Sequence, residues 1–154
     1  VVIAYPDHPP TTAVEIFENE KPILVHRKEF IKDSAGAGRF RGGPGQYYSF
    51  EVKGNRELRF AMRADRMFHP PLGFSDGLAG SVGRAILNGS VPLHSKRTVF
   101  LNPGDMVELE TPGGGGFFNP RSRSKDAIQR DIDNEIISPE KANSLYGHQT
   151  SVKK

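Results

Sequence analysis

The sequence contains no cysteine, few methionines and no long apolar run. Without cysteine the chain has no disulfides, no thiolate nucleophile and no cysteine-ligated zinc site. No stretch approaches the roughly 20 apolar residues that a membrane-spanning helix needs. The first residues, Val1–Tyr5, also lack the charged start of a signal peptide. These absences favour a cytoplasmic chain with no membrane partner.

The excess of basic over acidic residues is also small. The 21 basic and 18 acidic residues leave a net charge of +3. Much of the excess lies in Arg121, Arg123 and Lys125 and in the tail Lys153–Lys154. A nucleic-acid footprint normally requires a clustered basic stripe, so no nucleic-acid partner is expected.

Glycine is abundant instead, and it is concentrated in Ser34–Gly45 and Thr111–Gly116. An ordered glycine loses more backbone freedom than any other residue, so dense clusters indicate that the main chain itself is used. Gly113, Gly114, Gly115 and Gly116 could offer N–H groups to an anion. They are not a nucleotide P-loop, because no Gly-Lys-Ser/Thr follows. The alternative is close backbone packing where two loops meet.

Alternating apolar residues predict several short strands. The clearest runs are 47–52 and 57–63, and the turn Lys53–Asn55 between them predicts a hairpin. A second hairpin is predicted around Asn88-Gly89. Further strands are expected at 23–31, 97–101 and 106–110, the last two flanking a turn at 102–105. Residues 65–83 form a long loop, and loops of this length are often functional.

Helical patterns lie mainly near the C-terminus, apart from a short helix expected at 12–18. Isoleucines spaced four residues apart predict an amphipathic helix over 124–136. Ser138-Pro139 begins a second helix, and Gly147 ends it. The expected fold is mainly β within the α+β class, an antiparallel sandwich or rolled sheet with a C-terminal helical appendage. The expected divisions are an N-terminal segment 1–20, a β-rich domain 21–118 and the appendage 119–154.

Polar candidates for a substrate site or interface are scattered. Arginine suits bidentate recognition of carboxylates or phosphates, which singles out four arginines and one acidic neighbour: Arg39, Arg41, Arg63, Asp65 and Arg66. Asp65 could orient a guanidinium or form an internal pair that fixes the long loop. His69 lies in the same loop, but no histidine spacing is typical of a metal site. Gly73–Gly77 matches Gly-x-Ser-x-Gly without the strand–turn–helix context of a nucleophile elbow. No catalytic residue can be assigned.

Seven segments carry further information when they are taken in order: Val14–Ile16, Asp33–Gly43, Arg63–Arg66, His69–Gly73, Asn102–Asp105, Thr111–Phe117 and Ser138–Glu140. Together they resemble the C-terminal portion of the hydantoinase B/5-oxoprolinase family. The resemblance covers about residues 12–147. It implies ATP-dependent opening of cyclic amides, such as hydantoin or 5-oxoproline, or ATP-dependent carboxylation of ketones. Arg39, Arg41, Arg63, Asp65, Arg66 and Gly113–Gly116 match recurrent family positions.

The resemblance also implies partners for a small-molecule reaction. It predicts an A-type ATP-binding subunit, the remainder of a B-type subunit, and ATP and a divalent metal in the full complex. Neither ATP nor metal is expected to bind this chain by itself, and the isolated chain is expected to be inactive. The alternative is a non-enzymatic module that holds a partner subunit through the loop 65–83 and the segment 121–125.

Overall fold

The computed structural model describes residues 13–148, which form two compact units. The strand unit contains residues 13–29, 47–65 and 84–109, and the glycine unit contains residues 30–46, 66–83 and 110–148. The units are interleaved along the sequence, whereas the three ranges expected from sequence are consecutive. The N-terminal part of the expected segment 1–20 and the tail Lys153–Lys154 lie outside the described residues.

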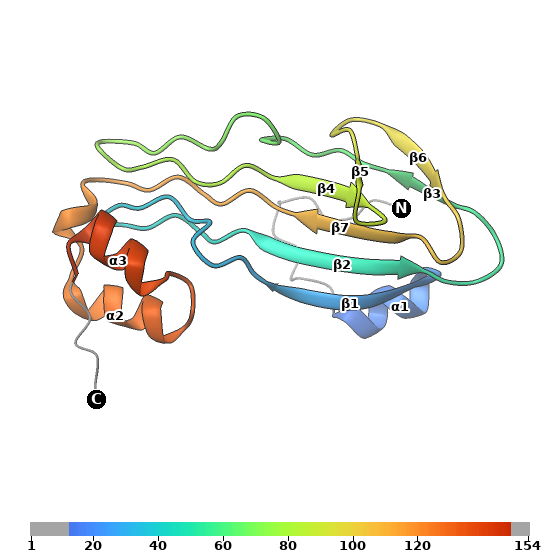
Figure 1. Cartoon of the computed structure of the whole chain (residues 1–154), viewed down its shortest axis with the longest axis horizontal. Coiled ribbons are helices and arrows are strands. Elements are labelled where there is room, and N and C mark those ends of the chain that lie inside the picture. Colours follow the sequence, from blue (N-terminus) through green and yellow to red (C-terminus); the bar gives the residue numbers. More distant parts are fainter. Residues whose placement is uncertain (1–12, 149–154) are drawn as a thin grey trace. The chain divides into compact units, whose positions relative to one another are not determined.

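Within residues 13–148, seven strands form two sheets (Figure 1). The five-stranded sheet has the order β1-β2-β7-β4-β5, and β3 pairs with β6 in a two-stranded sheet. Their bounds are β1 Ile23–Phe30, β2 Gln46–Val52, β3 Leu58–Ala61, β4 Arg84–Leu87, β5 Val91–Pro92, β6 Thr98–Leu101 and β7 Met106–Glu110. Each expected strand is therefore present, and its ends lie within two residues of the expected positions.

The core of the strand unit follows the predicted alternation. Phe50 and Val52 of β2 are fully buried, as are Leu101 and Val107. Phe60 of β3 lies with its ring centroid 5.9 Å from that of Phe50. Burying a side chain of this size stabilises the fold by roughly 1.5–3 kcal/mol, so these contacts hold the unit together.

The predicted hairpin between residues 47–52 and 57–63 is wrong. The end of β2 bonds to the turn before β7: Val52 N–H donates to Asp105 O at 2.9 Å, and Gly104 N–H donates to Val52 O at 2.8 Å. β3 instead pairs antiparallel with β6, with Phe60 opposite Val99. The two alternating runs meet through their apolar faces rather than their edges, which the alternation alone cannot distinguish.

The second predicted hairpin is confirmed. β4 and β5 pair antiparallel, with Ile86 opposite Pro92. The register leaves three residues, 88–90, between the strands. Asn88 has φ 51° and Gly89 has φ 70°, and Ser90 N–H donates to Leu87 O at 3.2 Å, which is the left-handed conformation of a type I′ turn.

Four short helical elements complete the described chain: α1 Val14–Glu20, the 3₁₀ turn Pro120–Ser122, α2 Lys125–Asp133 and α3 Pro139–Tyr146. Ser138 caps α3 by accepting a bond from Lys141 N–H at 3.2 Å, and Gly147 ends the helix at φ 69°. α2 and α3 pack around Ile128, Ala142 and Tyr146. The expected α+β class, mainly antiparallel with C-terminal helices, is confirmed. Among residues 13–148, no helix has the length and apolarity to cross a membrane.

Candidate functional site

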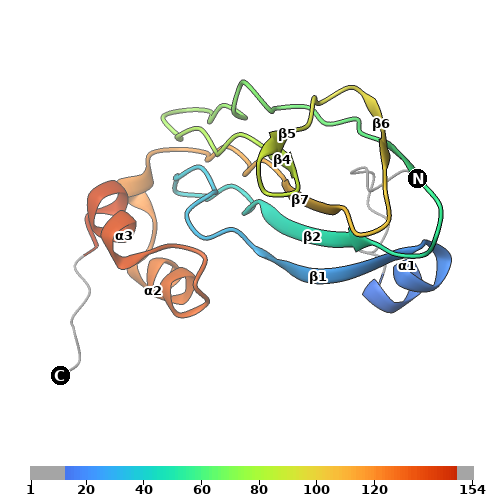
Figure 2. The ribbon, with the colours of Figure 1, turned by 45° about the vertical axis from the view of Figure 1, so that its right-hand side comes forward.

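Three extended segments run side by side in the glycine unit (Figures 1 and 2). We call residues 34–45, 71–83 and 111–118 the glycine bundle. Every pair of segments is joined by backbone hydrogen bonds. Gly36 N–H donates to Gly114 O at 2.8 Å, Leu78 N–H donates to Ala37 O at 2.7 Å, and Gly116 N–H donates to Leu78 O at 2.8 Å. The bundle is therefore closed on itself, without the regular ladder of a sheet.

Glycine is required because the backbones touch. A Cβ on Gly36 would lie 2.2 Å from Leu78 O, one on Gly80 would lie 2.0 Å from Gly113 O, and one on Gly113 would lie 2.0 Å from Ser34 O. Each segment thus presents a glycine to the next around the bundle. No real Cβ tolerates such a distance, so the cluster allows an approach that no other residue permits.

The N–H groups of Gly113–Gly116 are largely used within the chain. Gly113 donates to Ser81 Oγ at 3.1 Å, and Gly114 donates to Gly43 O at 2.8 Å. Gly116 donates to Leu78 O. Three of these four groups therefore point into the bundle, and the geometry does not fit an anion or a nucleotide phosphate.

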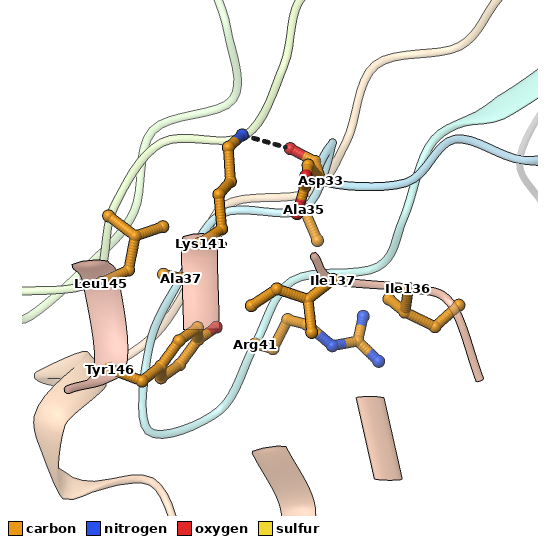
Figure 3. Close-up of a pocket in the computed structure, with 9 residues that line it drawn as sticks. All are labelled: Asp33, Ala35, Ala37, Arg41, Ile136, Ile137, Lys141, Leu145 and Tyr146. Atoms are coloured by element: carbon orange, nitrogen blue, oxygen red, sulfur yellow. Dashed lines mark hydrogen bonds between the residues drawn. The ribbon is translucent and has the colours of Figure 1, made fainter. Parts of the chain in front are cut away.

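Asp33 joins the bundle to the C-terminal helices. Its carboxylate accepts a bond from Ser138 N–H at 2.8 Å, and its carbonyl accepts one from Lys141 Nζ at 3.0 Å. Beside it lies a cavity about the size of one water molecule, lined in part by Arg41 and Tyr146 (Figure 3). Burial raises the pKa of the Tyr146 hydroxyl, while the Arg123 guanidinium and a Gly38 backbone hydrogen bond oppose that shift.

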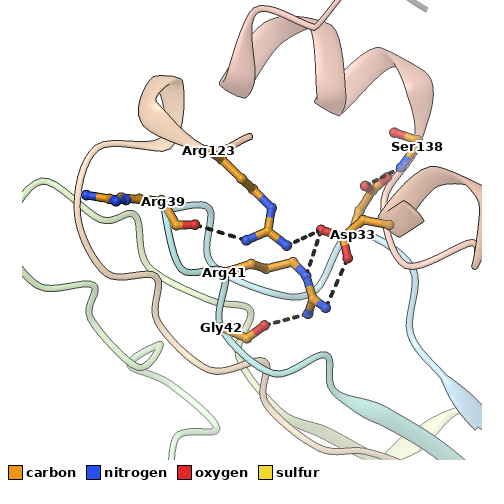
Figure 4. A network of polar contacts seen from close by, with 7 residues as sticks. Asp33, Arg39, Arg41, Gly42, Arg123 and Ser138 are labelled. Atoms are coloured by element: carbon orange, nitrogen blue, oxygen red, sulfur yellow. Dashed lines mark hydrogen bonds and ion pairs between the residues drawn. The ribbon is translucent and has the colours of Figure 1, made fainter. Parts of the chain in front are cut away.

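A second polar network surrounds Asp131, and Figure 4 labels its two partners, Arg41 and Arg123. Arg41 donates to Asp131 through Nε and Nη2, and Arg123 Nη2 donates to Asp131 Oδ2 at 2.8 Å. Arg123 Nη1 also reaches Arg39 O at 3.0 Å. The side chains of Arg41, Arg123 and Asp131 are 20%, 14% and 11% exposed. A carboxylate between two largely buried guanidiniums is typical of a structural cluster, and here it ties α2 to the bundle.

The residues singled out from sequence fall in different surroundings. Arg41 is paired, whereas Arg39 is exposed with its guanidinium 5.5 Å from the Phe40 ring centroid. Arg63 and Asp65 belong to the strand unit, where Asp65 pairs with Lys96 at 3.0 Å.

Arg66 and His69 are exposed residues of the glycine unit, and Arg66 has φ 60°. Neither Arg63 nor Arg66 forms an ion pair with any residue between 13 and 148. The structure therefore groups Arg39 and Arg41 with Gly113–Gly116, and it forms no internal pair between Asp65 and either neighbouring arginine.

Asp131 was the main residue that sequence reasoning missed. It lies three residues after Ile128 and one before Ile132, on the apolar face of α2, and is 8% exposed. An acidic residue on that face must find a cation when it is buried. That signal was readable in the sequence.

Four phenylalanines of the bundle also lie outside the set of residues predicted from sequence: Phe40, Phe74, Phe117 and Phe118. All are exposed by more than a third of their surface. The adjacent pair Phe117-Phe118 after four glycines was the sequence signal. No group of three His, Cys, Asp or Glu within residues 13–148 is arranged to hold a metal ion.

Known proteins resemble this chain over most of its length, and these proteins are themselves longer than the chain. An uncharacterised protein of Methanocaldococcus jannaschii is 37% identical over 138 residues, which cover 88% of this chain and 24% of that protein. The B-type polypeptide of a putative D-/L-hydantoinase from a Pseudomonas species is 32% identical, over 87% of this chain and 23% of its own length. The chain thus spans about a quarter of the length of these relatives.

Two solved structures share the fold. The ATP-dependent caprolactamase from Pseudomonas jessenii aligns with TM-score 0.69 and 24% identity over 92% of this chain and 26% of its own. The nucleotide-free acetone carboxylase aligns with TM-score 0.67 and 16% identity over 89% of this chain and 23% of its own. The family model described as Hydantoinase B/oxoprolinase matches residues 6–120, a range that contains the whole glycine bundle. The chain belongs to the hydantoinase B/oxoprolinase family.

Proposed function

We propose that this chain forms one structural part of a hydantoinase-B-type subunit, which acts with an ATP-binding A-type partner on a small cyclic amide or a ketone. The observation that carries the proposal is the family match over residues 6–120 in a chain that spans about a quarter of the length of the two relatives described above. In this proposal the chain supplies a rigid element, and the remaining subunit supplies most of the substrate site.

The residues present support a scaffold role. The N–H groups of Gly113–Gly116 are mostly donated within the bundle, and the carboxylate of Asp131 is held between two arginines. These groups fit neither a nucleotide site nor a metal site, so no chemical step is assigned to them. The prediction that ATP and a divalent metal act elsewhere in the complex remains a prediction.

Reconstitution tests the proposal. The components are this chain, the part of a B-type relative outside the matched segment, and an A-type subunit from the same relative's organism. ATP hydrolysis is measured with caprolactam, hydantoin, 5-oxoproline or acetone. Substrate-dependent turnover is expected only when all three proteins are present. Turnover by this chain alone would refute the proposal.

A paired control excludes trivial effects of added protein. Gly43→Ala leaves the bundle intact, since nothing lies within 4 Å of the added Cβ, whereas Gly80→Ala places that atom 2.0 Å from Gly113 O. The first variant should support turnover and the second should not. A complex that forms but hydrolyses ATP with none of the four substrates would favour the non-enzymatic interaction module.

A further inference from the structure

The glycine bundle carries a cluster of exposed aromatic rings. Phe40, Phe74, Phe117 and Phe118 come from its three segments and are 56%, 71%, 36% and 41% exposed. The Phe117 centroid lies 6.2 Å from that of Phe40, 5.7 Å from that of Phe74 and 3.9 Å from that of Phe118. We call these four residues the phenylalanine face.

The exposed apolar area falls in the range of surface patches that are often functional. With about 200 Å² for a whole phenylalanine residue, the four fractions leave roughly 400 Å² of phenylalanine surface in solvent. Patches of a few hundred square ångströms on soluble proteins often mark interaction sites. The face therefore differs from the single exposed phenylalanine that any surface carries.

The backbone holds these rings in place. Phe118 has φ 59°, a left-handed conformation that is rare for a bulky residue. Its N–H donates to Phe74 O at 3.1 Å, and Phe40 exchanges two backbone bonds with Phe117. After Phe74 the chain turns through Ser75 and Asp76, at φ 48° and 68°. Strained backbone persists only where its surroundings fix it, so the rings are preorganised anchors of the kind that dominate interfaces.

A cation, Arg39, lies at the rim of the phenylalanine face. Arg39 is exposed, with its guanidinium 5.5 Å from the Phe40 centroid, and no carboxylate within residues 13–148 forms an ion pair with it. The surface that covers the rings should therefore be apolar and bring an Asp or Glu to Arg39.

The length of the relatives indicates which polypeptide covers the phenylalanine face. All four rings lie inside the family match, and the two relatives described above carry about three quarters of their length outside the segment that this chain matches. We infer that the phenylalanine face is the surface on which the remainder of a B-type polypeptide packs, with one of its carboxylates on Arg39. This inference rests on the proposed function, and it names the contact that assembles the subunit.

Affinity provides the first test. The probe is the part of the Methanocaldococcus jannaschii relative outside the matched 138 residues, produced as a separate polypeptide and titrated with the full 154-residue chain. Phe74→Asp should weaken binding about tenfold or more, as expected for an anchor residue. The matched control is Phe100→Asp, because Phe100 is 63% exposed but lies in the strand unit. It should change the affinity by less than about twofold.

Thiol protection locates the contact. The chain has no cysteine, so Ser75→Cys places a single reporter beside Phe74, and Ser90→Cys places one in the strand unit. Alkylation is followed by mass spectrometry of this chain. The thiol at position 75 should react about tenfold more slowly in the complex, and the thiol at position 90 should react at its free rate.

Three results overturn the inference: no complex with the probe, equal reactivity at position 75 with and without it, or concentration-dependent protection in the chain alone, which would make the occupant a second copy.

Turnover separates this inference from the proposed function. Unimpaired activity and affinity with Phe74→Asp would reject the docking surface and retain the function. Protection of position 75 without turnover would reject the function and retain the surface.

Discussion

Arg41 donates two hydrogen bonds to Asp131, from Nε to Oδ2 at 3.1 Å and from Nη2 to Oδ1 at 3.2 Å, across 90 positions of sequence. The fork of the guanidinium matches the two carboxylate oxygens, which is the strong geometry for such a pair. Arg123 shares Oδ2 at 2.8 Å. The single carboxylate therefore balances two cations from different parts of the glycine unit.

Removing that carboxylate should be severe. Asp131→Asn keeps the side-chain shape but leaves two largely buried guanidiniums facing each other without a counter-charge. Breaking a buried pair in this way costs about 3–5 kcal/mol. Urea unfolding, with the midpoint and slope fitted together, measures the loss.

Asp65→Asn is the matched control for that variant. Its partner is Lys96, and the two side chains are 76% and 66% exposed. Exposed pairs contribute about 0–1 kcal/mol, so the midpoint should hardly move. If both variants lose the same stability, the Asp131 network does not hold the glycine unit together.

The second prediction is that two adjacent glycines, Gly42 and Gly43, respond to alanine substitution in opposite ways. A Cβ on Gly42 would lie 2.0 Å from Gly114 O, whereas one on Gly43 meets nothing within 4 Å. Gly42→Ala should therefore cost about 3 kcal/mol or more through overpacking. Gly43→Ala should be neutral or stabilise by about 0.4–1 kcal/mol, because it restricts the unfolded chain. Thermal unfolding of both variants checks the pair, and equal effects would show that backbone contact is not what selects glycine here.

Local patterns in the sequence predicted the elements well. The Asn88-Gly89 hairpin and the Ser138-Pro139 helix start are decided by neighbouring residues, and both are confirmed. The inward faces of the strand runs, with Phe50 and Phe60, were also readable from alternation.

Long-range relationships were not readable in the same way. The partner of β2 is decided by which edges meet after the chain has folded, so the expected hairpin with β3 is wrong. The glycine bundle needs contacts among three segments that lie far apart in the chain. No periodicity within one segment encodes those contacts, although the density of glycine shows that the backbone is in use.

A buried serine gives the third prediction. Ser34 is 4% exposed; its Oγ donates to Ile31 O at 2.6 Å and accepts from Gly45 N–H at 2.8 Å. Ser34→Ala leaves the Gly45 N–H buried without an acceptor, which costs about 1–3 kcal/mol. Chemical denaturation measures the loss, and amide exchange at Gly45 should accelerate. Ser144→Ala is the control, because its hydroxyl is exposed and makes a 3.4 Å contact; a similar loss there would rule out this explanation.

The last prediction concerns alkaline pH. Burial raises the pKa of Tyr146 in the folded chain above its ordinary value near 10. The folded state therefore holds the phenolic proton more tightly than the unfolded state does. The resulting stability is fully present below pH 10, and it is lost as the pH rises through the folded-state pKa. Tyr146→Phe removes the ionisable hydroxyl, so it should remove this part of the decline in stability at alkaline pH.

Stability curves at several pH values from 8 to 11 test that prediction. The difference between wild type and Tyr146→Phe should be constant below about pH 10 and should then move in favour of the variant. Tyr47 also has a raised pKa, caused first by burial and then by its bond to Glu108, and it lies in the strand unit. Tyr47→Phe gives a second alkaline difference from a separate location. If the difference in unfolding free energy between wild type and Tyr146→Phe stays constant to pH 11, the Tyr146 hydroxyl ionises as readily in the folded chain as in the unfolded one. The packing of α3 against Ala37 would then not exclude water from this hydroxyl, contrary to what the structure indicates.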